Sequence, residues 1–169
     1  MGRRNRTVIL GLGNTALTDD GVGVYAARRA KELLADDEEI EVEEAEIAGF
    51  GLLDLLDGRD RAVIIDAVNR PCCVPGETSL HPVESFEPTS HLISGHEIDL
   101  PTAVALGRQL GQSLPSEIYV VGVQVSDDRT LGEACTPEVE RAIDTAARLA
   151  LEVAREGVAT PPAIWKQSP

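Results

Sequence analysis

The hydrophobic pattern of residues 8–34 changes period once, and this change predicts a strand followed by a helix. The segment begins with a short apolar run, which is typical of a strand buried on both faces. Gly13 and Asn14 come next, and both residue types tolerate tight turns and left-handed backbone. From Val22 onward the apolar residues follow the three-and-four spacing of a helix with one buried face.

Two adjacent carboxylates, Asp19 and Asp20, stand where the period changes. In the first turn of a helix both are predicted to be ionised, because the helix dipole and unpaired N–H groups stabilise negative charge there. A phosphate-binding loop is excluded, since the turn has neither the third glycine of a dinucleotide fingerprint nor Gly-Lys-Ser/Thr, and two aspartates repel phosphate. A helix cap and a site for a cation or proton both remain open.

Composition narrows the class of protein. The chain has 169 residues, 43% of them apolar, which suits one domain, expected over residues 1–158 with a proline-rich tail at 159–169. The net charge of −14 argues against nucleic acid and against an anionic membrane surface. Neither a signal peptide nor a membrane span is predicted, so the expected location is the cytoplasm.

The cysteines are interpreted as structural or incidental. Cys72 and Cys73 are adjacent and Cys135 is distant, which gives neither a disulfide framework nor the CxxC spacing of a thiolate zinc site. A nucleophilic cysteine needs a nearby base, and nothing in the pattern points to one.

Strand and helix patterns alternate along the rest of the chain. An acidic run at 38–46 is typical of a solvated edge strand, and further strands are expected at 62–66, 77–83 and 118–125. Helices are expected at 52–56, after Pro101, and from Thr136 to about Glu156. This order predicts a three-layer α/β/α domain with a twisted, mainly parallel sheet of about five strands flanked by helices.

Two further polar residues stand where function is expected. Asp66 ends an apolar strand, so it should share an edge of the sheet with the Gly11 turn, although an aspartate that merely opens a loop is an equal alternative. His96 immediately precedes a helix start. His81 and His91 are expected to be surface residues.

An ordered set of motifs resembles one family, the hydrogenase maturation endopeptidases. The resemblance spans Val8 to about Ala154. One departure is Val125, where many members have proline. The motifs are Gly11-x-Gly13-Asn14, Asp19-Asp20-Gly21-x-Gly23, Ile64-Ile-Asp66-Ala67, Pro75-Gly76-Glu-Thr78, Ser94-x-His96 and Val121-Gly-Val-Gln124.

The resemblance implies a substrate and a site. Members of this family remove a short C-terminal peptide from the large-subunit precursor of nickel–iron hydrogenases after nickel insertion. The family's three metal-binding positions fall on Asp20, Asp66 and His96, which are therefore also the expected catalytic residues. Asp19 is then a neighbour of the ligand rather than a ligand.

The chemistry of these three side chains suits that assignment. Two carboxylates and one imidazole are suitable donors for nickel or zinc and leave coordination positions open. Binding needs a neutral histidine, so affinity should fall below about pH 6. Because no HExxH motif is present, we expect nickel to arrive with the precursor, with zinc or cadmium able to substitute. The pattern leaves open whether nickel polarises the scissile carbonyl or the trio deprotonates water.

Two other classes of function use the same features. A nickel carrier or insertion checkpoint without cleavage would need the same three ligands. Another hydrolase of similar architecture would act on general peptides or on peptidyl-tRNA, but the negative charge is unfavourable for RNA.

Overall fold

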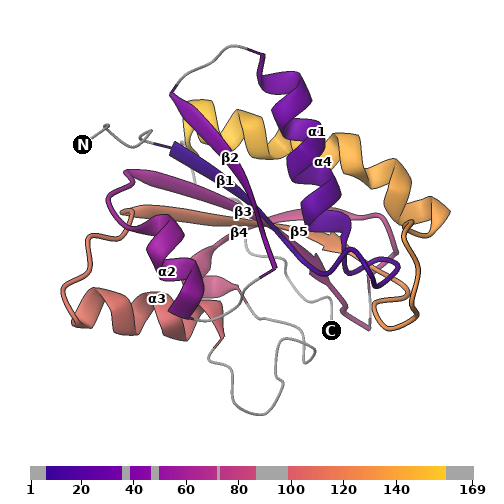
Figure 1. Cartoon of the computed structure of the whole chain (residues 1–169), viewed down its shortest axis with the longest axis horizontal. Helices are drawn as coiled ribbons and strands as arrows, with labels where there is room; N and C mark the ends of the chain where they lie inside the picture. The colour runs from indigo at the N-terminus through magenta and orange to yellow at the C-terminus, as the bar shows by residue number, and fades with distance from the viewer. Residues whose placement is uncertain (1–6, 36–38, 47–49, 72, 87–98, 159–169) are drawn as a thin grey trace.

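Five strands form one sheet in the order β2-β1-β3-β5-β4 (Figure 1). The computed structural model describes residues 7–35, 39–46, 50–71, 73–86 and 99–158. All neighbouring strands are parallel except β4, which is antiparallel to β5. The predicted mainly parallel sheet is therefore confirmed. The strands are β1 Thr7–Leu12, β2 Ile40–Ala45, β3 Arg61–Val68, β4 Thr78–Pro82 and β5 Glu117–Gln124.

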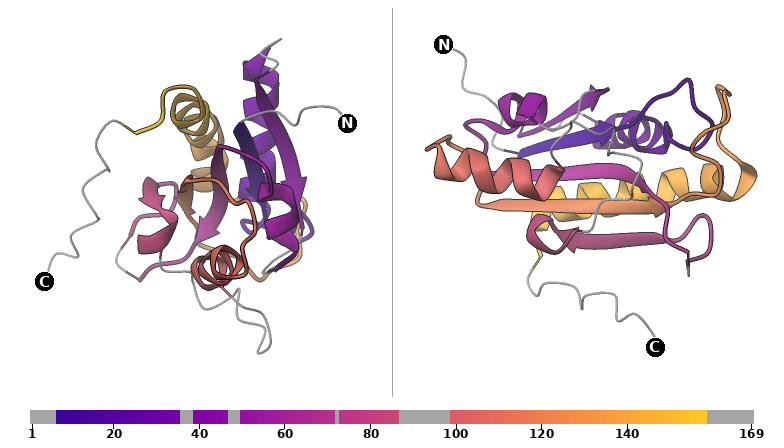
Figure 2. Two further views of the ribbon diagram at one scale, coloured as in Figure 1. Left: turned by 90° about the vertical axis from the view of Figure 1, so that its left-hand side faces the viewer. Right: turned by 90° about the horizontal axis from the view of Figure 1, so that it is seen from below.

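Helices cover both faces of this sheet, which gives the three predicted layers (Figures 1 and 2). One face carries α1 (Val22–Leu34) and α4 (Pro137–Glu156), and the other carries α2 (Phe50–Leu56) and α3 (Leu100–Gln109). A short 3₁₀ turn, η1 (Val83–Ser85), follows β4. Within the described ranges, no helix combines the length and the apolar character needed to cross a bilayer.

The central strands are continuously apolar because both of their faces are covered. Ile9 of β1 packs into the cluster beneath α1 and α4, whereas Val8 and Leu10 pack into the cluster beneath α2 and α3. In β3, Ile64 and Ile65 divide between the two clusters in the same way. Each of these side chains is fully buried and stabilises the fold by about 1.5–3 kcal/mol.

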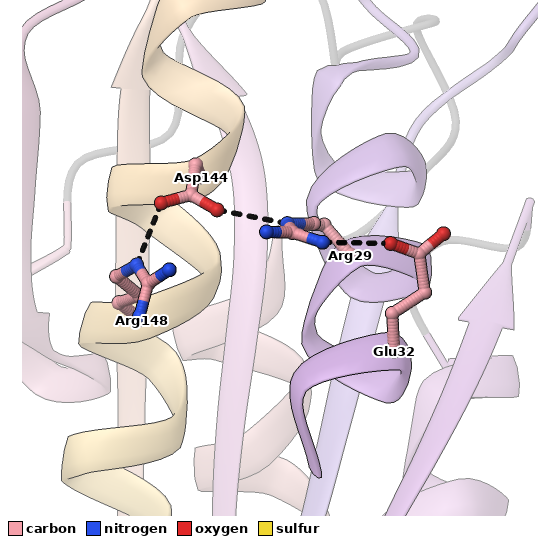
Figure 3. Close-up of polar contacts among 4 residues, drawn as sticks. All are labelled: Arg29, Glu32, Asp144 and Arg148. Carbon is pink, nitrogen blue, oxygen red and sulfur yellow. Dashed lines mark hydrogen bonds and ion pairs between the residues drawn. The ribbon is translucent and has the colours of Figure 1, made fainter. Parts of the chain in front are cut away.

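A surface network of charges connects α1 to α4 (Figure 3). Arg29 of α1 donates to Asp144 of α4 at 2.8 Å and to Glu32 at 2.9 Å, and Asp144 also accepts from Arg148 at 2.6 Å. These side chains are more than one third exposed, so water screens each pair and the pairs contribute little to stability. Buried alanines, not these ions, hold the two helices against the sheet.

The acidic strand β2 lies at an edge of the sheet as predicted, but its charges are not all solvated. Arg59 has a side chain only 2% exposed and donates to Glu41 at 2.7 Å and Glu43 at 3.3 Å. Arg28 of α1 forms a two-bond pair with Glu44. The solvation prediction was wrong here because these arginines come from elements that only the fold brings beside β2.

His81 is buried, so its predicted place on the surface was wrong. It lies in β4 opposite Val120, is 3% exposed, and its ring lies 6.1 Å from that of Phe86. Its Nε2 has no hydrogen-bond partner within the described part of the chain. Burial lowers the pKa of His81, and the positive charge of Arg70 lowers it further. His91 lies outside the described residues.

The buried neutral His81 should make the fold sensitive to acid. Because the folded-state pKa lies below the ordinary value of 6.5, the unfolded chain takes up a proton below that pH and the folded chain does not. This destabilisation of the fold by His81 is absent above pH 6.5. Below that pH it grows by up to about 1.4 kcal/mol for each pH unit. Replacing His81 by Leu should remove this part of the pH dependence.

Urea unfolding of the wild-type protein and His81→Leu at pH 7.5 and 5.5 measures the effect. We expect the wild type to lose more stability than the variant between these two pH values. Equal losses would contradict a neutral His81 in the fold.

Candidate active site

The candidate site lies at the carboxyl edge, the edge of the sheet where β1, β3 and β5 end. The loops that follow these strands lie together at one end of the sheet, on the right of the second view in Figure 2. Asp20 lies in the loop after β1, and Asp66 lies in β3. Asp66 does not end its strand, as the sequence had suggested, because β5 pairs with β3 as far as Val68. It nevertheless follows Ile65, the last residue of β3 that pairs with β1.

Neither aspartate caps the helix, which corrects the prediction that they lie in its first turn. The chain makes an extra turn first, and α1 begins at Val22 after Gly21. The Asp20 carboxylate instead accepts the backbone N–H of Asn14 at 2.8 Å and closes the loop. A capping role is therefore excluded, and the site for a cation or proton stays a prediction.

Glycines bring this loop against the strands. A Cβ built on Gly23 would lie 2.2 Å from the carbonyl oxygen of Leu12 and 2.3 Å from that of Ile65. Only glycine allows the first turn of α1 to approach both strands so closely. Because Asp66 follows Ile65 directly, this contact is what places the loop of Asp20 beside Asp66.

The two carboxylates interact electrostatically. Asp66 is 5% exposed, and burial raises its pKa to about 7, with the negative charge of Asp20 contributing and a hydrogen bond from the Ala67 N–H opposing the rise. At neutral pH this carboxyl group is thus divided between its protonated and ionised forms. Two carboxylates that repel each other in a buried setting favour a proton or a cation nearby, and their oxygens are suitable ligands for a divalent metal.

Asp19 is completely buried, but its pKa shifts in the opposite direction. Burial raises it, and hydrogen bonds from Thr136, Asp127 and Ser126 outweigh that effect, so the pKa lies below the ordinary value of 3.8. Asp19 is therefore an ionised group that is fully engaged with the protein. This agrees with its expected role as a neighbour rather than a ligand.

The third expected ligand, His96, lies outside the described residues. Within the ranges that the structure describes, no group of three or more His, Cys, Asp or Glu side chains forms a metal site. The structure thus brings Asp20 and Asp66 together, and the participation of His96 stays a prediction.

Gln124 is a structural contributor to which the sequence had assigned no role. It is 4% exposed, accepts the N–H of Arg70 at 3.1 Å and donates to the carbonyl oxygens of Arg70 and Val125 at 3.2 Å. It therefore holds the chain just after β3. The available signal was a polar residue that ends an apolar strand. The neighbouring Val125 donates its N–H to Val68 at 2.9 Å, a bond that the proline common in the family could not form.

Cys135 is not an activated nucleophile. Burial raises the pKa of its thiol to about 11, and the negative charges of Asp19 and Glu140 contribute to the rise. The thiolate is the reactive form, and it is scarce at neutral pH. This supports the interpretation of Cys135 as structural, whereas Cys72 lies outside the described residues.

A cavity of about 360 Å³ lies at the opposite edge of the sheet, where the strands begin. Its lining includes Arg61, which donates to Glu117 at 2.6 and 2.9 Å and to the carbonyl oxygen of Ala154 at 3.0 Å. Every guanidinium nitrogen of Arg61 is thus engaged, and it satisfies a carbonyl near the end of α4. The cavity lies at the end of the sheet opposite the acidic pair, and the bonds of Arg61 in its lining connect β3, β5 and α4.

A mainly parallel α/β fold is shared with solved structures of peptidases. The structure of the hydrogenase maturating endopeptidase HybD from Escherichia coli matches with a TM-score of 0.70 and 28% identity, covering 89% of this chain and 93% of that one. The [NiFe] hydrogenase maturation protease HybD from Thermococcus kodakarensis matches with a TM-score of 0.60 and 26% identity, covering 89% and 99%. Both likenesses extend over nearly the whole domain.

Sequence comparisons agree with the structural ones. The hydrogenase 2 maturation protease of Escherichia coli is 28% identical over 152 residues, which are 89% of this chain and 92% of that protein. The family model for hydrogenase maturation proteases matches residues 24–153. The chain belongs to the hydrogenase maturation protease family and is thus a peptidase, a class of hydrolase.

Proposed function

We propose that this peptidase removes the C-terminal peptide of a nickel–iron hydrogenase large-subunit precursor after nickel insertion. In this proposal, Asp20, Asp66 and His96 recognise the inserted nickel by coordinating it. The observation that supports this proposal is that the buried Asp66 lies close enough to the partly exposed Asp20 for the charge of Asp20 to help raise the pKa of Asp66. Two neighbouring carboxylates at the carboxyl edge are suitable oxygen ligands for a divalent cation. The peptidase activity in this proposal is assigned from family membership.

In this account nickel belongs to the substrate. The precursor brings the ion to the carboxyl edge, where Asp20 and Asp66 offer oxygen ligands that differ in burial and in the element that carries them. Asp66 is buried in a rigid central strand, whereas Asp20 is partly exposed in a loop and is oriented by the N–H of Asn14. Coordination fixes the precursor relative to the protease, and water then adds across the peptide bond to give a new carboxyl end and a free amine.

Dependence on nickel tests this reading function. We expect a nickel-loaded precursor to be cut and the same precursor without nickel to stay intact, because only the loaded form offers an ion to the acidic pair. Metal analysis of the purified protease should find far less than one ion per chain.

Either of two results would contradict the proposal. One is equal cleavage of nickel-free and nickel-loaded precursor, and the other is a stoichiometric, tightly held metal in the protease itself. The second result would point instead to a resident catalytic metal.

A further inference from the structure

The two loops on either side of the candidate site are bound to each other around one buried side chain. The loop after β1 covers residues 13–21, and the loop between β5 and α4 covers residues 125–136. They lie side by side at the carboxyl edge in the right-hand view of Figure 2. Asp19 belongs to the first loop, and within the described residues its carboxylate accepts hydrogen bonds from the second loop.

Five donors converge on that carboxylate. Its Oδ1 accepts the N–H of Thr136 at 2.7 Å. Its Oδ2 accepts the N–H and the hydroxyl of Ser126 at 3.1 and 3.2 Å, the N–H of Asp127 at 2.9 Å, and the hydroxyl of Thr136 at 3.0 Å. The side chain is 0% exposed. A buried charge is tolerated only when it is this fully hydrogen-bonded.

The backbones of the two loops add further bonds to this connection. The N–H of Asp19 donates to the carbonyl oxygen of Asp127 at 2.8 Å, and Thr18 donates from both its N–H and its hydroxyl to Thr130 at 2.9 Å. The N–H of Gly132 donates to Ala16 at 3.0 Å. The two loops are therefore joined by backbone and side-chain hydrogen bonds, five of them to the Asp19 carboxylate.

The donor set requires a carboxylate in particular. An ionised aspartate only accepts hydrogen bonds, so it can satisfy three backbone N–H groups and two hydroxyls together. An asparagine would direct its NH₂ group at one or more backbone N–H groups, which cannot accept a hydrogen bond. The position is therefore specific for aspartate.

The site depends on this connection because Asp20 is the next residue. The carbonyl oxygen of Asp19 accepts the N–H of Val22 at the start of α1, so Asp20 lies between a fixed residue and a fixed helix start. The connection leads to β5, which pairs with β3 at Asp66. Strand β5 thus holds both carboxylates in place: it pairs with β3 at Asp66, and the loop that follows it binds Asp19, the neighbour of Asp20.

We propose that Asp19 is a positioning residue for the peptidase reaction, which holds Asp20 opposite Asp66 by binding the loop after β1 to the loop after β5. The proposal rests on the proposed function of Asp20 and Asp66. Asp19 contacts neither substrate nor nickel, so its effect passes entirely through the placement of Asp20. A misplacement on the order of 1 Å can lower a rate by about 10²-fold.

The test compares variants of the full chain on nickel-loaded precursor, at a temperature where circular dichroism shows each to be folded. Asp19→Asn should process about 10²-fold more slowly and bind Ni²⁺ added alone about 10-fold more weakly than the wild type. Thr136→Val, which removes one hydroxyl, should show a smaller loss of both, and Thr136→Ser should restore them. Asp20→Asn is the reference for loss of the site itself.

Leu56→Ala separates positioning from general stability. Leu56 is fully buried at the end of α2, next to the edge where β3 begins, and its truncation should lower the melting temperature while leaving rate and Ni²⁺ affinity unchanged. If Asp19→Asn does not fold, the pair Thr136→Val and Thr136→Ser carries the test.

The outcomes distinguish the two proposals. Wild-type processing by Asp20→Asn would overturn the proposed site. If Asp20→Asn is inactive, a wild-type rate and Ni²⁺ affinity in Asp19→Asn, or in Thr136→Val where Asp19→Asn does not fold, would overturn only the positioning role.

Discussion

The Asp66→Asn variant is expected to process precursor at least about 10³-fold more slowly than the wild type while folding at least as stably. The loss follows from replacing a carboxylate, which can bind a cation or accept a proton, by a neutral amide of the same shape. Intact mass of the precursor over time measures the rate. Asp144→Asn is the matched control, because Asp144 is a half-exposed carboxylate in the α1–α4 network and its loss should leave the rate unchanged.

The stability of Asp66→Asn should depend on pH in a defined direction. Burial and the charge of Asp20 raise the pKa of Asp66 from 3.8 to about 7, so the folded chain binds this proton more tightly than the unfolded chain. Stability therefore decreases as pH rises from about 4 to 7, and the full penalty applies above 7. The amide has no charge to bury, so the variant should be more stable than the wild type at pH 8 by a few kcal/mol, at about 1.4 kcal/mol per pKa unit.

Urea unfolding at pH 8 and pH 5 measures this difference, which should shrink at the lower pH. A variant less stable than the wild type at pH 8 would show that the buried charge of Asp66 does not destabilise the fold. Wild-type processing by the same variant would remove Asp66 from the site.

The Gly23→Ala variant is expected to lose more than about 4 kcal/mol of stability, or to fail to fold. The added Cβ would lie 2.2 Å from the carbonyl oxygen of Leu12 and 2.3 Å from that of Ile65. Both atoms belong to the backbone of central strands, so neither can move aside as a flexible side chain would. The first turn of α1 would have to lift from the sheet and take the loop of Asp20 with it.

Gly111→Ala is the control for this substitution. Gly111 has a φ of +80° but open space around its Cβ position, so alanine there should cost only about 1 kcal/mol of backbone strain. Chemical denaturation of both variants, with circular dichroism for the folded fraction, gives the comparison. A Gly23→Ala protein with stability within about 1 kcal/mol of the wild type would contradict the close contact between α1 and the strands.

The elements that the sequence predicted well are those determined by local pattern. The apolar runs at β1, β3 and β5 are buried on both faces, and Thr136-Pro137 marks the start of α4 as expected. Even the strand within the proline-rich region, β4, falls inside the predicted range 77–83. In each case the element is determined by the burial or backbone preference of a few neighbouring residues. The periodic pattern of the sequence shows this preference directly.

The features that the sequence missed depend on contacts between distant residues. His81 is buried because β4 pairs with β5, and Arg59 is buried because β2 lies beside it. The donors to Asp19 stand 107 to 117 residues later in the chain, so the sequence near Asp19 does not predict them. The same limit applied to Asp20 and Asp66. Strand topology could predict that they share an edge, but the glycine contact that joins them became visible only in the fold.

The most direct test of the proposed processing is the intact mass of a nickel-loaded hydrogenase large-subunit precursor after incubation with this protein. We expect the precursor to lose the mass of one C-terminal peptide and to stay whole in a parallel incubation with Asp66→Asn. An unchanged mass in the wild-type incubation, with a cognate precursor confirmed to carry nickel, would contradict the proposed processing and favour a nickel-binding module without cleavage.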